Sequence, residues 1–480
     1  MLKELVESAN NNLSRCNFSP HYLIPYYLIF VLAVITSMAI VSDYNKHPDE
    51  PHHFLAAQYY LNHWLPPKIG DPTAKPTYSI WGSSYLNTWG IEYFLAGKVA
   101  FLLLPLIGQE LISIRLFNVL IFFLLLVIYF HRSRSQHEQL IPLVFFLTTP
   151  QAWYIFSYIN NDAFALFLSL IIISEITYST SPLNQFLAAN SFRDRLAGGI
   201  LFGLLLGILS LSKQNYYVFL LFIGCWFLYT TITFNFSIHG KDTIHFIPRI
   251  EFNNRLILKY LFILFIGLSV FTTRYALDMV VNERISLPSP LLFLFKKSDS
   301  RLLAYQEQVA DPRFKPSTLA NHLDKSYYSL HLKDKGLDYS ALFSQWRWHE
   351  LSFQSFVGSY GFLSISASDR YYYLMKWVYI SFFLFLIISI LLSNNRSNII
   401  FMFIVLLNIS LTIVISTYLS WTSAFQAQGR YLFPIIGMIG LFLFQSKNHL
   451  HNWIMNAFIF CLFLLSSYSF LFVALYRINQ

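Results

Sequence analysis

Long runs of apolar residues, separated by short polar breaks, are the main pattern along this chain. A helix that crosses a bilayer needs about 20 mostly apolar residues, because its backbone polar groups have no water to bond in hydrocarbon. The pattern predicts an all-α polytopic integral membrane protein of about eleven spanning helices, within a range of about nine to thirteen because the third and tenth runs are short. The predicted spans are residues 22–42, 111–130, 139–150, 161–179, 196–212, 215–233, 257–277, 373–393, 398–417, 431–446 and 452–475.

Two longer polar segments, residues 43–110 and 278–372, interrupt this series of spans. Lys and Arg near helix ends collect in cytoplasmic loops, and this bias sets the orientation of a membrane protein. With a cytoplasmic N-terminus, the short outer loops at residues 151–160 and 418–430 hold only Arg430, and both long segments lie on the outer face. The basic residues of the predicted inner loops are Arg132, Arg134, Arg193, Arg195, Lys241, Arg249, Arg255, Lys259, Arg396 and Lys447.

The first outer segment carries two further helical patterns. Residues 52–65, HHFLAAQYYLNHWL, predict an amphipathic helix, and residues 93–108, YFLAGKVAFLLLPLIG, are apolar apart from Lys98. A span at residues 93–108 would move every later basic loop to the other side, so we expect interfacial helices in the headgroup region. No linker separates domains, and residues 1–480 are predicted to form one membrane domain.

Composition agrees with the membrane class. Charged residues are 12%, hydrophobic residues 55% and aromatic residues 19% of the chain, an apolar excess that a soluble fold could not bury. The net charge of +9 is scattered among apolar runs rather than gathered on a face, which argues against a nucleic-acid partner. Cys16, Cys225 and Cys461 are far apart and form no CxxC pair, which argues against a disulfide framework or a zinc knuckle.

The stretch SDYNKHPDEPHHF, residues 42–54, follows directly on the first predicted span. Its acids Asp49 and Glu50 are bracketed by Pro48 and Pro51, which restrict the backbone on both sides. A carboxylate at a low-dielectric boundary can have its pKa raised toward neutrality, which suits a general base. We therefore take Asp49 and Glu50 as candidate catalytic residues, with a solvated pair of loop charges as the alternative.

Three histidines, His47, His52 and His53, surround these acids. Together they offer ligand types that suit a divalent ion such as zinc, Mn²⁺ or Mg²⁺, but no fixed spacing such as HExxH is present. His52 and His53 are adjacent and would point about 100° apart on a helix. We therefore assign no metal ligand and no cofactor, keep a divalent ion as the alternative, and expect His53 to hydrogen-bond the acids or a substrate.

Polar residues also mark the outer ends of later predicted spans. Asn161 and Asp162, in YINNDAFALFLSL, are candidates to face a substrate, although Asn and Asp also cap helices. Lys213, in LSKQNYYV, is a candidate to meet a phosphate, although a lysine there can also snorkel to lipid headgroups.

Two late motifs complete the candidate site. Arg430, in QAQGRYLFPI, stands where the topology bias disfavours positive charge, which indicates an anionic partner: a phosphate, or an ion pair with Asp49 or Glu50. Gln428 precedes it in the same motif. The stretch SFQSFVGSYG, which includes Tyr360, is either an interfacial aromatic belt or the lining for an isoprenoid tail or a sugar ring.

Four motifs, PDEPHHF, NNDAFA, SFQSFVGSYG and QGRYLFP, follow in order along the chain, and RLFNVL begins the second predicted span. In this pattern the chain resembles the GT-C glycosyltransferases, such as the aminoarabinose transferases and protein O-mannosyltransferases. It is most similar to a family of bacterial polytopic proteins with PDEPxHF early and QGRYxxP late. The resemblance runs from about residue 25 to residue 475.

The resemblance implies a GT-C-like bundle that transfers a sugar, with inversion, from a polyprenyl-phosphate donor on the outer face. Asp49 maps onto the family's acidic base, with Glu50 beside it, and Arg430 and then Lys213 would stabilise the leaving phosphate. Residues 278–372 are too short for the β-trefoil insertion of the protein-mannosylating members. A glycan or lipid acceptor is therefore expected, with membrane lipids as the surroundings.

Two other functions fit the sequence. A transporter or flippase of lipid-linked saccharides would need polar residues along the middle of several spans, whereas here they gather at the outer ends. A non-catalytic subunit of an envelope polysaccharide or lipopolysaccharide assembly machine is the other alternative. The pattern favours the inner membrane of a bacterium, with a cytoplasmic N-terminus and a periplasmic active site.

Overall fold

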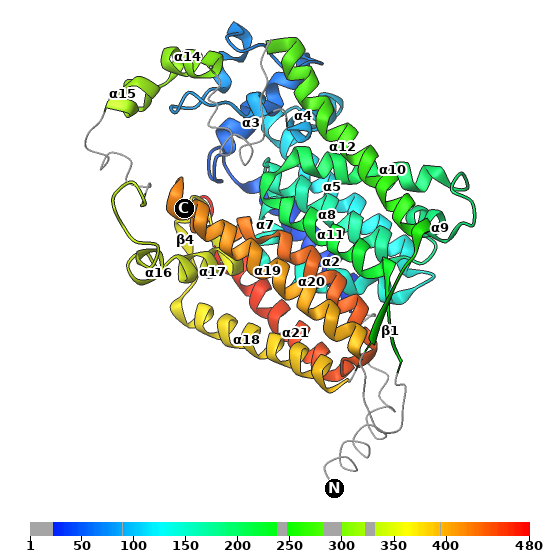
Figure 1. Cartoon of the computed structure of the whole chain (residues 1–480). Helices are drawn as coiled ribbons and strands as arrows, with labels where there is room; N and C mark the ends of the chain where they lie inside the picture. Colours follow the sequence, from blue (N-terminus) through cyan, green and yellow to red (C-terminus); the bar gives the residue numbers. More distant parts are fainter. Residues whose placement is uncertain (1–22, 89, 238–246, 283–299, 322–331, 394) are drawn as a thin grey trace.

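A computed structural model describes residues 23–88, 90–237, 247–282, 300–321, 332–393 and 395–480 (Figure 1). The described chain is a helical bundle with two small antiparallel ribbons. Strand β1 (Ile232–Ser237) pairs with β2 (Ile247–Phe252), and β3 (Ser359–Tyr360) pairs with β4 (Ile365–Ser366). Cys225 and Cys461 are free thiols, while Cys16 and Lys241 of the sequence analysis lie outside the described residues.

In the described part of the chain, seven helices are long and apolar enough to cross a membrane, and the number rises to nine if two bent pairs each count as one span. The prediction of an all-α integral membrane protein is confirmed. The predicted number of spans, nine to thirteen, overlaps with the observed seven to nine only at nine. The seven are α2 (Ile24–Val41), α5 (Glu110–Ser133), α12 (Asn254–Asn282), α18 (Asp369–Leu392), α19 (Arg396–Thr422), Gly429–His449, which contains α20 (Pro434–Ser446), and Trp453–Leu475, which contains most of α21 (Asn452–Tyr468).

Two of the predicted spans are bent and two are short. The pair His137–Leu147 and Pro150–Ser157 turns by 96°, because Pro150 begins a new helix, and the pair Asn161–Thr177 and Pro182–Ala188 turns by 41°. Helices α10 and α11 have only 17 and 15 residues. The remaining helices are α3 (Glu50–Asn62), α4 (Ile91–Ile107), α6 (Val144–Leu147), α7 (Pro150–Tyr154), α8 (Asn161–Thr177), α9 (Pro182–Ala188), α10 (Leu196–Ser212), α11 (Tyr217–Thr231), α14 (Ser300–Val309), α15 (Pro316–Asn321), α16 (Ala341–Ser344) and α17 (Trp348–Gly358).

Small residues let helices α10 and α12 lie close together. A Cβ atom added at Gly203 would lie 2.8 Å from the carbonyl oxygen of Ile263, and one at Gly207 would lie 2.8 Å from the carbonyl oxygen of Gly267. Glycines spaced four residues apart on one face allow this approach of two backbones, which is a common way to join helices in membranes. Figure 1 shows the two helices side by side.

Polar contacts mark two opposite ends of the bundle. At one end Arg132 pairs with Glu175, and Lys447 pairs with Glu138. We call this the Arg132 end. The bent pair His137–Leu147 and Pro150–Ser157 starts at this end and leads to the other end, where Asn118 donates to the carbonyl oxygen of Tyr158 over 2.5 Å. The sharp bend therefore lies within one passage through the bundle.

The first long polar segment, residues 43–110, forms the two predicted helices, α3 and α4. They cross closely, since a Cβ at Gly97 of α4 would lie 2.5 Å from the carbonyl oxygen of Ala57 in α3. Helix α4 has 17 residues and is not among the candidate spans, and its position in the headgroup region stays a prediction. Residues 300–321 of the second long polar segment pack on the first: the Asp311 amide donates to the Ile80 carbonyl over 3.0 Å, and Trp81 contacts Phe314. Figure 1 shows α14 and α15 beyond α3.

Candidate active site

The turn between α2 and α3 has an unusual backbone. Asn45 and Asp49 both adopt the left-handed region, with φ of 63° and 58°. Asp49 is the N-cap residue of α3, yet its carboxylate does not cap the helix amides, as an N-cap aspartate commonly does. Its side chain is 46% exposed and turns toward Arg430. Strained positions of this kind persist only where the surrounding structure holds them, and they are frequent at functional sites.

Glu50, the second acid of the turn, is fully buried and paired with Arg115. Arg115 donates from Nε to Oε1 over 2.6 Å and from Nη2 to Oε2 over 2.9 Å, which is a bidentate pair. The same guanidinium donates to the carbonyl oxygens of Ala39, Ser42 and Asp43 at the end of α2. Free carbonyls at a helix end need such partners. Glu50 and Arg115 therefore join α2, α3 and α5 and leave no carboxylate oxygen for a substrate.

Arg430 connects the acidic turn to the end of the chain. Its Nη2 donates to Oδ2 of Asp49 over 3.1 Å, and its Nη1 lies 3.9 Å from Oδ2 of Asp162. The side chain is buried, and its Nε has no partner among the described residues. Oδ2 is likewise the only oxygen of the Asp49 carboxylate that a described side chain engages. The pair is thus incomplete on both sides.

Lys213 forms the other cationic contact of the site. Its ammonium lies 2.8 Å from Oδ2 of Asp162 and donates to Oδ1 of Asn161 over 2.8 Å. Asn160, rather than Asn161, caps the N-terminus of α8, since its side-chain oxygen accepts a hydrogen bond from the Ala163 amide. Burial lowers the pKa of Lys213 from its ordinary value, and the Asp162 charge opposes this shift. Asp162 and Lys213 therefore form a largely buried ion pair beside Arg430.

His53 is buried one turn into α3, where Nδ1 lies 2.6 Å from the hydroxyl of Tyr93 and the ring stacks on Tyr85 at 4.1 Å. His47 is bonded similarly, with Nδ1 at 2.7 Å from the hydroxyl of Tyr154 and Nε2 at 2.8 Å from Oγ of Ser42. Burial holds the pKa of each histidine well below its usual range, so both are neutral near pH 7. Neither imidazole is hydrogen-bonded to the Asp49 or Glu50 carboxylate. Of the two partners expected for His53, the acids or a substrate, only the substrate remains a prediction.

The last two motifs meet at Gly429. Its amide donates to Oγ of Ser355 over 3.0 Å, and a Cβ there would lie 2.2 Å from the backbone nitrogen of Phe356. Only glycine fits this contact, which fixes the adjacent Arg430. Gln428 is partly buried and precedes this contact.

Tyr360 is buried away from the ion pairs. Its hydroxyl lies 2.9 Å from Oγ of Ser469, and its ring meets the edge of Tyr154, which binds His47. In this position it supports the acidic turn through Tyr154.

No group of three or more His, Cys, Asp or Glu side chains in the described residues is placed to hold a metal ion. Both ring nitrogens of His47 and Nδ1 of His53 are bonded to tyrosines or to Ser42, whereas Nδ1 of His52 has no partner among the described residues.

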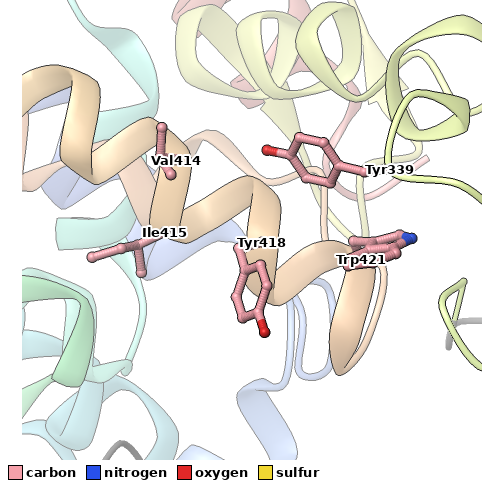
Figure 2. A pocket seen from close by; sticks show the side chains of 5 residues that line it. All are labelled: Tyr339, Val414, Ile415, Tyr418 and Trp421. Atoms are coloured by element: carbon pink, nitrogen blue, oxygen red, sulfur yellow. The ribbon is translucent and has the colours of Figure 1, made fainter.

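An apolar pocket of about 350 Å³ lies on α19, near its C-terminal end (Figure 2). The hydroxyl of Tyr339 lies 2.5 Å from Oγ1 of Thr417 beside it. None of its lining residues belongs to the charged cluster around Asp49. They are Tyr339, Val414, Ile415, Tyr418 and Trp421.

Sequence reasoning missed several contributors to the site. Arg115 stands in the quoted motif RLFNVL but has no predicted partner, and Glu92, which precedes the apolar run at residues 93–108, is not among the candidates. Tyr93 and Tyr158 had no signal in the sequence, because their contacts with His53 and His47 depend on the fold.

Comparisons with models of known protein families, with curated protein sequences and with solved structures find no match for this chain.

Proposed function

We propose that the chain is an integral membrane glycosyltransferase with a GT-C-like bundle. It would transfer a sugar from a polyprenyl-phosphate donor to a glycan or lipid acceptor on the extracytoplasmic face. The observation that carries the proposal is the Asp49 carboxylate: half exposed, on a strained turn at the end of the first span, and held through one oxygen by a buried arginine. A carboxylate fixed in this way has one oxygen free to accept a proton.

The reaction is a single displacement. An acceptor hydroxyl attacks the anomeric carbon of the donor sugar, and the bond from that carbon to the phosphate oxygen breaks on the opposite face. Asp49 takes the hydroxyl proton through its free oxygen, and polyprenyl phosphate leaves with the bonding electron pair. The product has the inverted anomeric configuration.

Arg430 and Lys213 are the groups that receive the leaving phosphate. Cations aimed at a developing charge in a site of low dielectric contribute strongly to such a step. Arg430 has an unpaired buried Nε, and Lys213 is held beside it by Asp162. The Glu50–Arg115 pair acts by position, since it fixes the turn that presents Asp49.

All eleven predicted segments cross the membrane in this proposal, with α10 and α11 as short crossings. Arg132 and Lys447, at the opposite end from Asp49, then lie in the cytoplasm, as the bias of basic residues requires. The N-terminus is cytoplasmic, Asp49 faces the periplasm, and the compartment is a bacterial inner membrane.

Complementation of a deletion strain tests the function. The strain carries the wild-type chain or Asp49→Asn at matched membrane levels, and mass spectrometry compares the surface glycans and lipids. The wild type is expected to restore a glycosyl group that Asp49→Asn does not restore. Equal restoration by both would contradict a catalytic Asp49 and favour a carrier or assembly subunit.

A further inference from the structure

Behind Lys213 and Asp162 lies a buried acid that the proposed reaction does not use. Glu92, in the first turn of α4, is fully buried, and no other described residue is hydrogen-bonded to its carboxylate, which has only its own backbone amide within reach. Burial raises its pKa to about 8, against the opposing charges of Lys213 and Arg274. A buried carboxyl without a protein partner is uncommon and indicates an absent one, either water or a ligand.

Other buried polar atoms without partners belong to residues that interact electrostatically with the same charges as Glu92. Tyr216 lies within electrostatic reach of Asp162, and Tyr217 and Tyr275 lie within reach of Arg274. Glu92 interacts electrostatically with Asp162 and Lys213 of the ion pair and with Arg274 of α12, so it connects the charged cluster to α12. The buried atoms without partners in this region are Oε1 and Oε2 of Glu92, Oδ1 of Asp162, Nε of Arg274, Nε of Arg430 and the hydroxyls of Tyr216, Tyr217 and Tyr275.

The hydrogen-bond donors and acceptors among these atoms indicate which class of ligand could satisfy them. Guanidinium N–H groups only donate, the ionised Asp162 carboxylate only accepts, and tyrosine hydroxyls and a protonated carboxyl such as that of Glu92 do both. A lone anion would face the charge of Asp162, and a lone cation would face Arg274 and Lys213. A neutral polyol, whose hydroxyls both donate and accept, satisfies the whole set.

We propose that Glu92, Tyr216, Tyr217 and Arg274 form the subsite that binds the glycosyl group of the donor. This inference rests on the proposed function, because it places the sugar next to the cations that receive the phosphate. Lys213 joins the two parts: it contacts Asp162 directly and lies within electrostatic reach of Glu92. Glu92 is neutral at pH 7 and offers both a donor and an acceptor to sugar hydroxyls.

Binding measurements on the full chain in lipid nanodiscs test the subsite. The probes are undecaprenyl phosphate alone and undecaprenyl phosphates that carry a hexose, an N-acetylhexosamine or a pentose. The wild type is expected to bind at least one glycosylated lipid about tenfold more tightly than the bare lipid. Tyr217→Phe and Glu92→Leu should each weaken that preference by about 3- to 10-fold, with binding of the bare lipid unchanged.

Tyr217→Phe removes a hydroxyl that bonds nothing in the described protein, so its effect does not depend on refolding. Tyr229→Phe, which removes a hydroxyl bonded to Ser397 at the Arg132 end, is the matched control and should keep the full preference. An unchanged preference in both test variants, or an equal loss for bare and glycosylated lipid, would overturn the subsite alone. A wild type that binds none of the four lipids would overturn the proposed function as well.

Discussion

Two neighbouring residues, Asp49 and Glu50, are each paired with a buried arginine, and the two pairs differ in the exposure of the acid and in the number of hydrogen bonds. The Glu50–Arg115 pair is fully buried, and both carboxylate oxygens are bonded. In the Asp49–Arg430 pair the acid is 46% exposed and one contact of 3.1 Å joins the partners. We call the Glu50–Arg115 pair saturated, because both carboxylate oxygens are bonded, and the Asp49–Arg430 pair unsaturated, because one is not. The comparison teaches that a saturated pair stabilises the fold, whereas an unsaturated pair can still bind another molecule.

The largest expected effect is loss of the folded state when the saturated pair is broken. Arg115→Leu leaves the buried Glu50 without its charged partner and frees the carbonyls at the end of α2, and breaking a buried pair costs about 3–5 kcal/mol. The variant should fail to give a monodisperse protein in detergent. Size-exclusion chromatography and thermal unfolding measure this.

The matched control is an exposed pair, Arg347 with Glu350, whose side chains are 64% and 41% exposed. Arg347→Leu should cost about 0–1 kcal/mol, because water replaces the partner. If Arg115→Leu unfolded no more readily than Arg347→Leu, the structural role of the saturated pair would be wrong.

The next effect falls on activity. Arg430→Gln should lower the rate of glycosyl transfer about 10²- to 10³-fold, as the loss of one charge-stabilising donor does in other enzymes. Its unfolding temperature should stay close to that of the wild type, because Asp49 can be hydrated once the arginine is gone. Transfer assays with membranes of known protein content measure the rate. A rate within about twofold of the wild type would remove Arg430 from the mechanism.

The smallest effect concerns Glu92 and the pH dependence of stability. Its pKa is about 8 in the folded chain and ordinarily 4.5, so between these pH values the folded state holds a proton that the unfolded chain has lost. Stability must therefore fall as the pH rises through this window. In Glu92→Gln this part of the fall disappears, and the unfolding temperature should drop by about 5 °C less between pH 6 and pH 9.

Glu110→Gln, at an exposed carboxylate bonded to Gln58, serves as the control and should keep the wild-type slope. An equally steep fall in Glu92→Gln and the wild type would show that another group causes the pH dependence.

The sequence predicted the elements of the bundle better than their lengths. Apolar runs located the helices, since hydrocarbon demands an internal partner for each backbone group. They did not reveal the 96° bend at Pro150 or that α10 and α11 have only 17 and 15 residues, because tertiary packing decides whether a short apolar run continues as a helix.

For the site, the sequence offered an ion pair of Arg430 with Asp49 or Glu50 as one alternative, but it did not predict the pair of Asp162 with Lys213. The structure joins Asp49 to Arg430 and Asp162 to Lys213, whereas the separation of Asp49 from Glu50 into two roles had no local signal. That separation arises from Arg115, which lies 65 positions from Glu50, and no periodicity links the two. Glu92 was invisible for the same reason, since burial is a property of the assembled bundle.

The rate of sugar transfer by purified Asp49→Asn in nanodiscs, relative to the wild type, tests the central claim most directly. Asn keeps the size of the side chain and a hydrogen-bond acceptor but cannot take up the proton. The account predicts a rate at least about 10²-fold lower, with the unfolding temperature unchanged. Transfer at the wild-type rate by a correctly folded Asp49→Asn would contradict it.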